Sequence, residues 1–247
     1  MIPTNQQARS IQAADTTLLR RVRPDIIVQS GIPELDALLG GFKAGETTLV
    51  DGNSTLIAQL PDRLSVHTYH TFHAETIYLD AGMRADPYHI AKYARALELD
   101  QQEVLENIVI SRAFTVYQLS TLIRDLLEPL IQKKSPRTLV IGMLPALYMD
   151  PDVQPHEAET LLAGDLQTIK ELTTRYNLIT VMTNLDAVPL SPSRGLGKIL
   201  YENASDILQM KQFDHTTRLA LMKKQKNATI IHATRGQLRL EEFGMVI

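Results

Sequence analysis

The residues best suited to bind a phosphate form a short polar run, Asp51-Gly52-Asn53-Ser54-Thr55. This run follows Thr47–Val50, whose β-branched and apolar residues predict a strand, and precedes Leu56–Phe72, which we expect to be helical. A loop between a strand and a helix can bind phosphate through backbone N–H groups at the positive end of the helix dipole. A phosphate-binding loop also carries a lysine, but this run has one glycine and no lysine, and the next cation is Arg63.

Two further groups of residues have types that could do chemistry. His67, His70 and His73 recur at every third position, so on a helix they share one face, where zinc is conceivable. No carboxylate completes the set, and exposed helix faces often carry such histidines, so we predict no metal site. The carboxylates within residues 154–176 are expected on a solvated helix face. Serines lack a G-x-S-x-G context, so no catalytic residue is predicted.

The composition limits the classes of protein that this chain can belong to. It has 247 residues, 44% hydrophobic and 21% charged, which is ordinary for a globular protein. No apolar run approaches the ~18 residues that cross a bilayer, and the first residues lack the apolar core of a secretory signal. The absence of cysteine excludes disulfides and thiolate chemistry. We therefore expect a cytoplasmic protein, or a nuclear one if the source is eukaryotic.

Charge is unevenly distributed along the chain. The net charge of −3 argues against a protein that coats nucleic acid with its whole surface. Between Arg194 and Arg239, however, nine Lys and Arg residues face three acids, which leaves an excess of six positive charges. A solvated surface and an anion-binding face both fit this excess.

The elements that must position these residues alternate along the chain. The expected helices are Glu34–Leu39, Leu56–Phe72, Tyr88–Leu97, Val116–Gln132, Gln154–Tyr176 and Lys198–Asn203. The expected strands are Thr47–Val50, Glu75–Asp80, Ile108–Ser111, Thr138–Tyr148, Asn177–Thr183, Asp206–Lys211, Thr216–Lys223, Thr229–Ala233 and Gln237–Glu242. A polar turn is expected at Lys43–Glu46, and a surface loop at the Pro-, Ser- and Gly-rich Asp186–Gly197.

The segment Ser30–Asn53 and the spacing of elements after it resemble the core domain of the RecA/RadA recombinase superfamily, which includes KaiC-like ATPases. The resemblance extends to about Gly244. It implies an α/β fold of the RecA-like P-loop NTPase type, with a mostly parallel central sheet flanked by helices and antiparallel C-terminal strands. It divides the chain into an N-terminal tail or docking segment, residues 1–28, and a core domain, residues 29–247. In recombinases, such an upstream segment hands a strand to the neighbouring subunit.

The resemblance also identifies four positions that serve ATP hydrolysis, and each is changed here. The phosphate lysine is missing from residues 51–60, and Gly82 replaces the glutamate that activates water. Gly142 replaces the aspartate that holds Mg²⁺, and Leu185 replaces the glutamine that senses the γ-phosphate. Removing one such electrostatic donor costs ~10²–10³ in rate, so we expect negligible turnover. Neither ATP nor Mg²⁺ is expected as a cofactor, and the degenerate loop is the one remaining candidate for nucleotide binding.

Asp186–Gly197 falls where recombinases carry a DNA-contacting loop, so the resemblance makes Arg194 and Lys198 the DNA-binding residues. We predict a non-hydrolysing recombinase paralogue, an accessory factor in homologous recombination or DNA repair. Its partners would be DNA, a recombinase or a sister paralogue subunit, in a homodimer or heteromer, with no membrane contact. One alternative is a KaiC-like regulatory or scaffold module without nucleic-acid binding, since that loop lacks aromatic residues. Another is a residual ATP-binding protein.

Overall fold

The computed structural model describes residues 26–186 and 190–232 of the chain. The strand expected at Gln237–Glu242 and most of the tail at residues 1–28 lie outside these ranges. Within them, the short strand β1 (Ile27–Val28) pairs antiparallel with β2 (Phe42–Lys43). Residues 27 and 28 therefore contact the domain. Lys43, the first residue of the predicted polar turn Lys43–Glu46, is instead the last residue of β2.

An eight-stranded sheet forms the centre of the described chain, in the order β10-β9-β8-β3-β7-β6-β4-β5. The six strands from β8 to β5 in this order are parallel to one another, whereas β9 is antiparallel to both of its neighbours, β8 and β10. The strands are β3 (Thr47–Gly52), β4 (Thr76–Asp80), β5 (Ile108–Arg112), β6 (Thr138–Gly142), β7 (Ile179–Leu185), β8 (Asp206–Phe213), β9 (Thr216–Leu221) and β10 (Lys226–Ile231). The RecA-like α/β fold expected from the sequence is confirmed.

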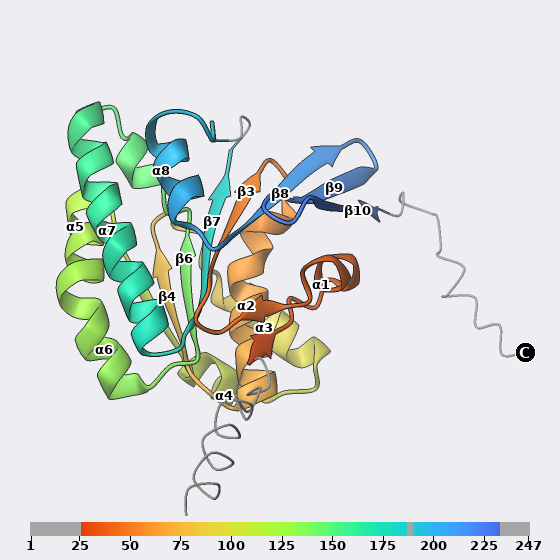
Figure 1. Ribbon diagram of the computed structural model, residues 1–247. Helices are drawn as coiled ribbons and strands as arrows, with labels where there is room; N and C mark the ends of the chain where they lie inside the picture. Colours follow the sequence, from red (N-terminus) through yellow and green to blue (C-terminus); the bar gives the residue numbers. More distant parts are fainter. Residues whose placement is uncertain (1–25, 187–189, 233–247) are drawn as a thin grey trace, which may run out of the picture.

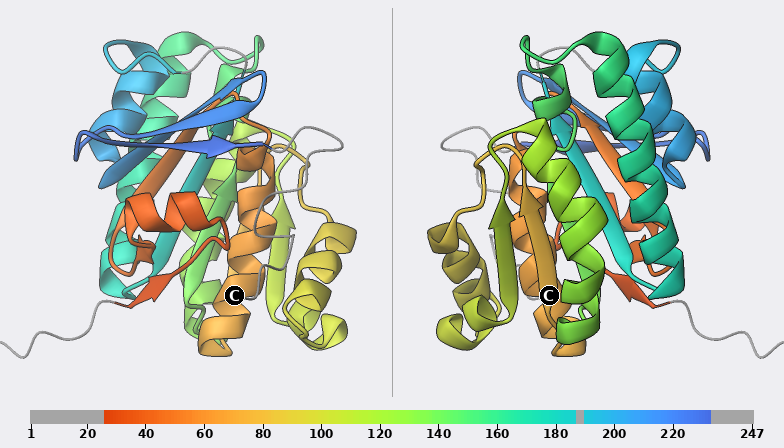
Figure 2. Two further views of the ribbon diagram at one scale, coloured as in Figure 1. Left: turned by 90° about the vertical axis from the view of Figure 1, so that its right-hand side faces the viewer. Right: turned by 90° about the vertical axis from the view of Figure 1, so that its left-hand side faces the viewer.

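Helices cover both faces of the sheet, because its central strands alternate apolar side chains toward two separate cores. One core lies under α1 (Pro33–Leu39), α2 (Leu56–Phe72), α3 (Pro87–Ala96) and α4 (Gln101–Glu106). The other lies under α5 (Val116–Thr121), the π-helix η1 (Leu122–Leu126), α6 (Leu127–Lys134), α7 (Pro155–Arg175) and α8 (Gly195–Asn203). The two helical layers stand on opposite sides of the sheet in Figures 1 and 2.

The strand expected over Thr138–Tyr148 is wrong in its second half. β6 ends at Gly142, and the 3-10 helix η2 (Ala146–Met149) follows. Met143 takes a left-handed conformation with φ of 57°, and Pro145 precedes η2 without a backbone N–H to continue the ladder. An apolar run alone does not distinguish a strand from a buried turn.

Two helices also depart in detail from the expectation. The helix predicted over Val116–Gln132 contains the π-helical turn η1 between α5 and α6. Pro61 lies inside α2 without ending it, since the helix continues to Phe72. None of the helices in the described part of the chain combines the length and the apolar character needed to cross a bilayer.

Candidate functional site

The loop at the position of a phosphate-binding loop is very short. Asn53, Ser54 and Thr55 are the residues between the end of β3 and the start of α2. The motif G-x-x-x-x-G-K-[ST] needs eight residues to wrap its backbone around a phosphate. Three residues turn the chain directly from the strand into the helix, so they form no such cradle.

The first N–H groups of α2 already have partners inside the loop. Ile57 donates its backbone N–H to the carbonyl oxygen of Ser54 at 3.0 Å, and Ala58 donates to that of Thr55 at 3.2 Å. The N–H of Leu56 donates to the Ser54 hydroxyl at 3.4 Å. Donors at a helix start attract anions because they lack partners, and these three groups do not meet that condition.

The side chains of the loop are tied to the C-terminal strands. Ser54 is fully buried, and its hydroxyl donates to Oε1 of Gln212 at 3.1 Å and lies 3.2 Å from Oγ1 of Thr217. Oδ1 of Asn53 accepts the backbone N–H of Gln212 at 2.7 Å. These bonds hold the loop against β8 and β9.

Gly52, the last residue of β3, allows close packing of two strands. Its φ is +148°, and a Cβ atom there would lie 2.1 Å from the carbonyl oxygen of Met210 on β8. The following N–H, that of Asn53, donates to the same oxygen at 3.1 Å. This contact accounts for a glycine at position 52 without any ligand.

A tyrosine packs over Gly142, the position that the resemblance assigns to a metal-binding aspartate. Gly142 ends β6, and a Cβ atom there would lie 2.9 Å from Cε2 of Tyr78 on the neighbouring strand β4. The Tyr78 hydroxyl is buried and has no hydrogen-bond partner within the described residues. Burial raises the pKa of Tyr78, with Asp80 adding to the effect. A carboxylate at position 142 could not be accommodated unless Tyr78 moved.

Gly82, the position that the resemblance assigns to a water-activating glutamate, is also closely packed. A Cβ atom at Gly82 would lie 2.4 Å from Cγ of Met143, so the residue after Gly142 packs directly against Gly82. The backbone N–H of Met143 donates to Oγ1 of Thr183 at 3.1 Å, which fixes this packing to β7. The side chains of Tyr78 and Met143 therefore occupy the space beside Gly142 and Gly82.

Asp51, which precedes Gly52, is the centre of a buried hydrogen-bond network. Its Oδ1 accepts from Nδ2 of Asn184 and its Oδ2 from the hydroxyl of Tyr201, both at 2.8 Å. The Tyr201 hydroxyl in turn accepts from Nε2 of Gln209 at 3.1 Å. Burial raises the pKa of Asp51, although the two hydrogen bonds oppose this effect. The network joins β3, β7, β8 and α8, so the hydrogen bonds of Asp51 hold α8 against the sheet.

Arg194 and Lys198, the predicted DNA contacts, lie together at the start of α8. Arg194 is the residue before the helix, and the N–H of Lys198 donates to its carbonyl oxygen at 3.2 Å. Both side chains are exposed, and Nζ of Lys198 lies 3.9 Å from Oε1 of Glu202. Residues 187–189 of the same loop lie outside the described residues.

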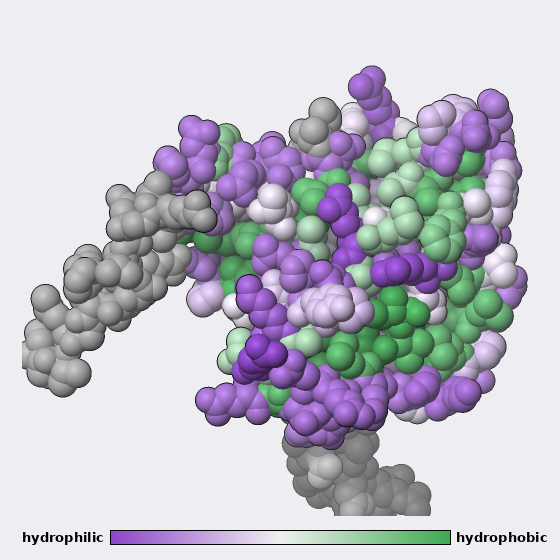
Figure 3. All heavy atoms as spheres, turned by 180° about the vertical axis from the view of Figure 1, so that it is seen from behind, coloured by the Kyte–Doolittle hydropathy of each residue, from purple (hydrophilic) through white to green (hydrophobic). Residues whose placement is uncertain are grey.

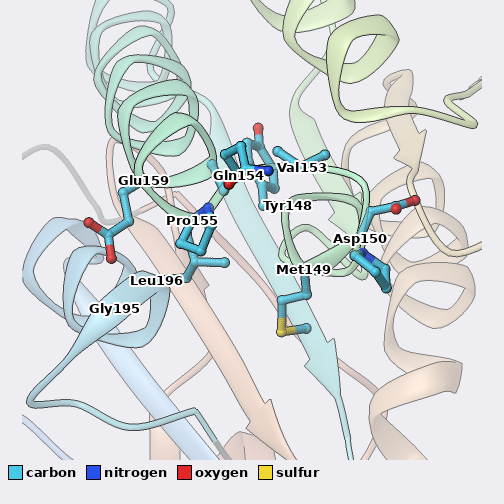
Figure 4. Close-up of a pocket in the computed structure, with 11 residues that line it drawn as sticks. Tyr148, Met149, Asp150, Val153, Gln154, Pro155, Glu159, Gly195 and Leu196 are labelled. Carbon is cyan, nitrogen blue, oxygen red and sulfur yellow. The ribbon is translucent and has the colours of Figure 1, made fainter.

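A pocket of about 460 Å³ opens beside the start of α8 (Figure 4). Its walls come from η2 and the starts of α7 and α8, and they are mostly apolar, with Met149, Val153 and Leu196 among them. The charged residues in the lining are Asp150 and Glu159, with no Lys or Arg. The pocket is therefore unsuited to the charges of a nucleoside triphosphate.

His67 and His70 of α2 pack against neighbouring groups of the fold. The ring of His67 packs against Gly31, and its centroid lies 6.3 Å from that of His70. Burial lowers the pKa of His67. Over residues 26–186 and 190–232, no three His, Asp or Glu side chains are grouped so that they could hold a metal ion.

A family model described as Rad51 matches residues 22–236, which is most of the chain and includes every element of the sheet.

Proposed function

We propose that this chain, which belongs to the Rad51 family of the RecA/Rad51 recombinase superfamily, is a member without ATPase activity that acts as an accessory subunit in recombination or repair. Members of the family are usually ATPases. Phosphoryl transfer depends on a lysine and a metal ion that stabilise the charge of the transition state. The single observation that carries the proposal is the three-residue loop whose neighbouring N–H groups already have partners.

The test is steady-state ATP hydrolysis with Mg²⁺, in the presence and absence of single-stranded DNA. We expect no turnover above a no-protein blank. Ser54→Ala, purified in parallel, identifies contaminants, because it changes a residue of the loop itself. Turnover that DNA stimulates and that Ser54→Ala alters would refute the proposal.

Thermal denaturation with Mg·ATP separates a residual ATP-binding protein from a protein that does not bind ATP. A ligand at 100 times its Kd stabilises the folded state by about 2.7 kcal/mol, which for a chain of this size raises Tm by several degrees. We expect no shift at millimolar ATP. A shift that saturates with ATP would support the alternative of residual binding.

The β5 edge supports a protein partner for this subunit. β5 is the outer strand at one end of the sheet, and Phe114, Tyr117 and Leu126 beside it are exposed. Two neighbouring cavities, of about 440 and 200 Å³, share Leu122 and Leu126 in their linings. The π-helical turn η1 supplies both leucines. Hydrophobic residues gather on the rear face of the molecule in Figure 3.

An unpaired edge strand with an apolar groove beside it suits the addition of a strand from another chain. We therefore assign this edge to a second RecA-like subunit, whether a copy of this chain or a paralogue. The strand would pair with β5 and place apolar side chains in the two cavities. This arrangement follows the strand exchange that the family resemblance implies.

Leu126→Glu tests this assignment because Leu126 is 52% exposed and its replacement leaves the core intact. The molar mass of the wild-type chain, alone and mixed with recombinase-family subunits, is measured by light scattering. We expect an assembly that Leu126→Glu disrupts. Met222→Glu is the matched control, since Met222 is 41% exposed and lies after β9, at the far end of the sheet. Equal disruption by both variants would refute the assignment.

Binding of single-stranded DNA decides between the accessory factor and the scaffold alternative. We expect binding that weakens with salt and weakens further in Arg194→Gln/Lys198→Gln. A wild-type chain that fails to bind DNA at low salt would favour the scaffold module.

A further inference from the structure

The outer surface of the C-terminal strands combines two cations with an exposed aromatic ring. Lys211 on β8 lies directly opposite Arg218 on β9, and Phe213 lies opposite Thr216. Directly opposed residues of antiparallel strands project from the same face, so these four side chains share one surface. We name it the hairpin face. β10 extends it, because Thr229 pairs with Arg218.

The charges of the hairpin face are unbalanced. Lys211 and Arg218 are exposed, and within the described residues neither forms an ion pair. Two like charges directly across a ladder destabilise the pairing, so this pair does not serve the stability of the sheet. The closest carboxylate along the chain is that of Asp214, in the turn between the two strands. An anionic partner would relieve the repulsion.

An aromatic ring lies between these cations and the turn. Phe213 is 48% exposed, although the guanidinium of Arg218 lies 5.3 Å from its ring centroid. An exposed ring on a sheet costs free energy in water, whereas a ring beside cations can stack against an unpaired base while the cations contact the phosphates. A base inside a duplex presents no such face, so the composition favours a single strand over a duplex.

The hairpin face lies on the same side of the sheet as α8. Gln209 is two residues before Lys211 on β8, so both project to one side, and Gln209 bonds to Tyr201 of α8. β8 runs past the end of β3, since Gly52 pairs with Met210 and the hairpin continues to Phe213. The hairpin thus extends beyond the carboxyl end of β3, and its tip points away from the helices in Figure 1.

We propose that the hairpin face is a binding platform for single-stranded DNA, in which Phe213 stacks on a base and Lys211 and Arg218 contact phosphates. The proposal rests on the nucleic-acid role given under the proposed function, and adds a site separate from Arg194 and Lys198. It supplies the aromatic residue that the loop at residues 186–197 lacks.

Fluorescence anisotropy with labelled oligo-dT, titrated over a range of salt, tests the platform. Phe213→Ala should weaken binding about 5- to 150-fold, the range expected for one lost base stack. Lys211→Gln/Arg218→Gln should reduce the slope of log K against log salt by about 1.4, since each single-strand phosphate contact contributes about 0.7. The matched control, Lys92→Gln/Arg95→Gln, removes two exposed charges from α3 and should leave the slope unchanged.

The outcomes separate the two claims. If the wild-type chain binds and only Arg194→Gln/Lys198→Gln weakens it, the platform is refuted and the nucleic-acid role stands. If the wild-type chain does not bind at low salt, both are refuted. Equal binding of duplex DNA, unaffected by Phe213→Ala, would also overturn the platform. Circular dichroism of each variant checks that the fold is retained, as expected for exposed side chains.

Discussion

Replacing Asp62 with asparagine should stabilise the protein at alkaline pH and have little effect at acidic pH. Asp62 lies on α2 and is 1% exposed, and its Oδ1 has no hydrogen-bond partner within the described residues. Its Oδ2 is 3.9 Å from Nδ1 of His89. Burial, reinforced by the nearby charges of Asp86 and Asp80, raises the pKa of Asp62 to about 7.

The size of the effect follows from this pKa. An aspartate in the unfolded chain has a pKa of about 3.9, so the pKa of Asp62 differs by about three units between the folded and unfolded chains. At 1.36 kcal/mol per unit, the ionised carboxyl can lower the free energy of unfolding by at most about 4 kcal/mol. Between about pH 4 and pH 7 the folded chain keeps a proton that the unfolded chain loses. This carboxyl therefore lowers the stability progressively as the pH rises through that window, and its effect is constant above it.

The assay is urea denaturation of the wild-type chain and Asp62→Asn at pH 5 and pH 8. We expect Asp62→Asn to be more stable by up to about 4 kcal/mol at pH 8, with a smaller difference at pH 5. His89→Gln is the control, because it removes the one histidine that faces Asp62 and should retain the pH dependence. A difference between wild type and Asp62→Asn that does not change with pH would show that the carboxylate is not buried as described.

Three further predictions concern residues in and around the candidate site, and the first two have a matched control variant. Tyr78→Phe should raise the free energy of unfolding by about 1 kcal/mol, because its hydroxyl is buried without a partner among the described residues. The control Tyr148→Phe should lower the free energy of unfolding by about 1–3 kcal/mol, because that hydroxyl donates to Asp165 at 2.6 Å. Thermal denaturation measures both effects. Gly52→Ala should lower the free energy of unfolding by more than 2 kcal/mol, because the added Cβ atom would collide with Met210. The control Gly40→Ala has open space around its Cβ position and should lower the free energy of unfolding by only about 1 kcal/mol. Urea denaturation measures both values. Asp51→Ala should destabilise the folded chain by about 3 kcal/mol, because it leaves the buried donors of Asn184 and Tyr201 unpaired. It should also speed proteolysis near α8. Unchanged proteolysis would show that other contacts hold α8 in place.

The fold could be predicted largely from local patterns. Apolar runs in the sequence predict the buried parallel strands, and Gly and Pro predict many of the turns between them. The absence of a lysine from residues 51–60 is also a property of the sequence alone. The strand boundary at Gly142 was not predictable in this way, because Met143 and Leu144 continue the apolar run although the backbone turns there.

The packing around the predicted nucleotide site depends on contacts between segments that are distant in the sequence. The sequence showed a glycine at position 142, but only the tertiary structure places the Tyr78 ring over it. The sequence placed Asp51 in a loop, yet its partner Tyr201 is 150 residues away. The hairpin face likewise exists only because the register sets Lys211 opposite Arg218. Local residue types determined which elements form and that residues 51–60 carry no lysine, whereas long-range packing decided which side chains lie beside Gly82 and Gly142 and which charges meet.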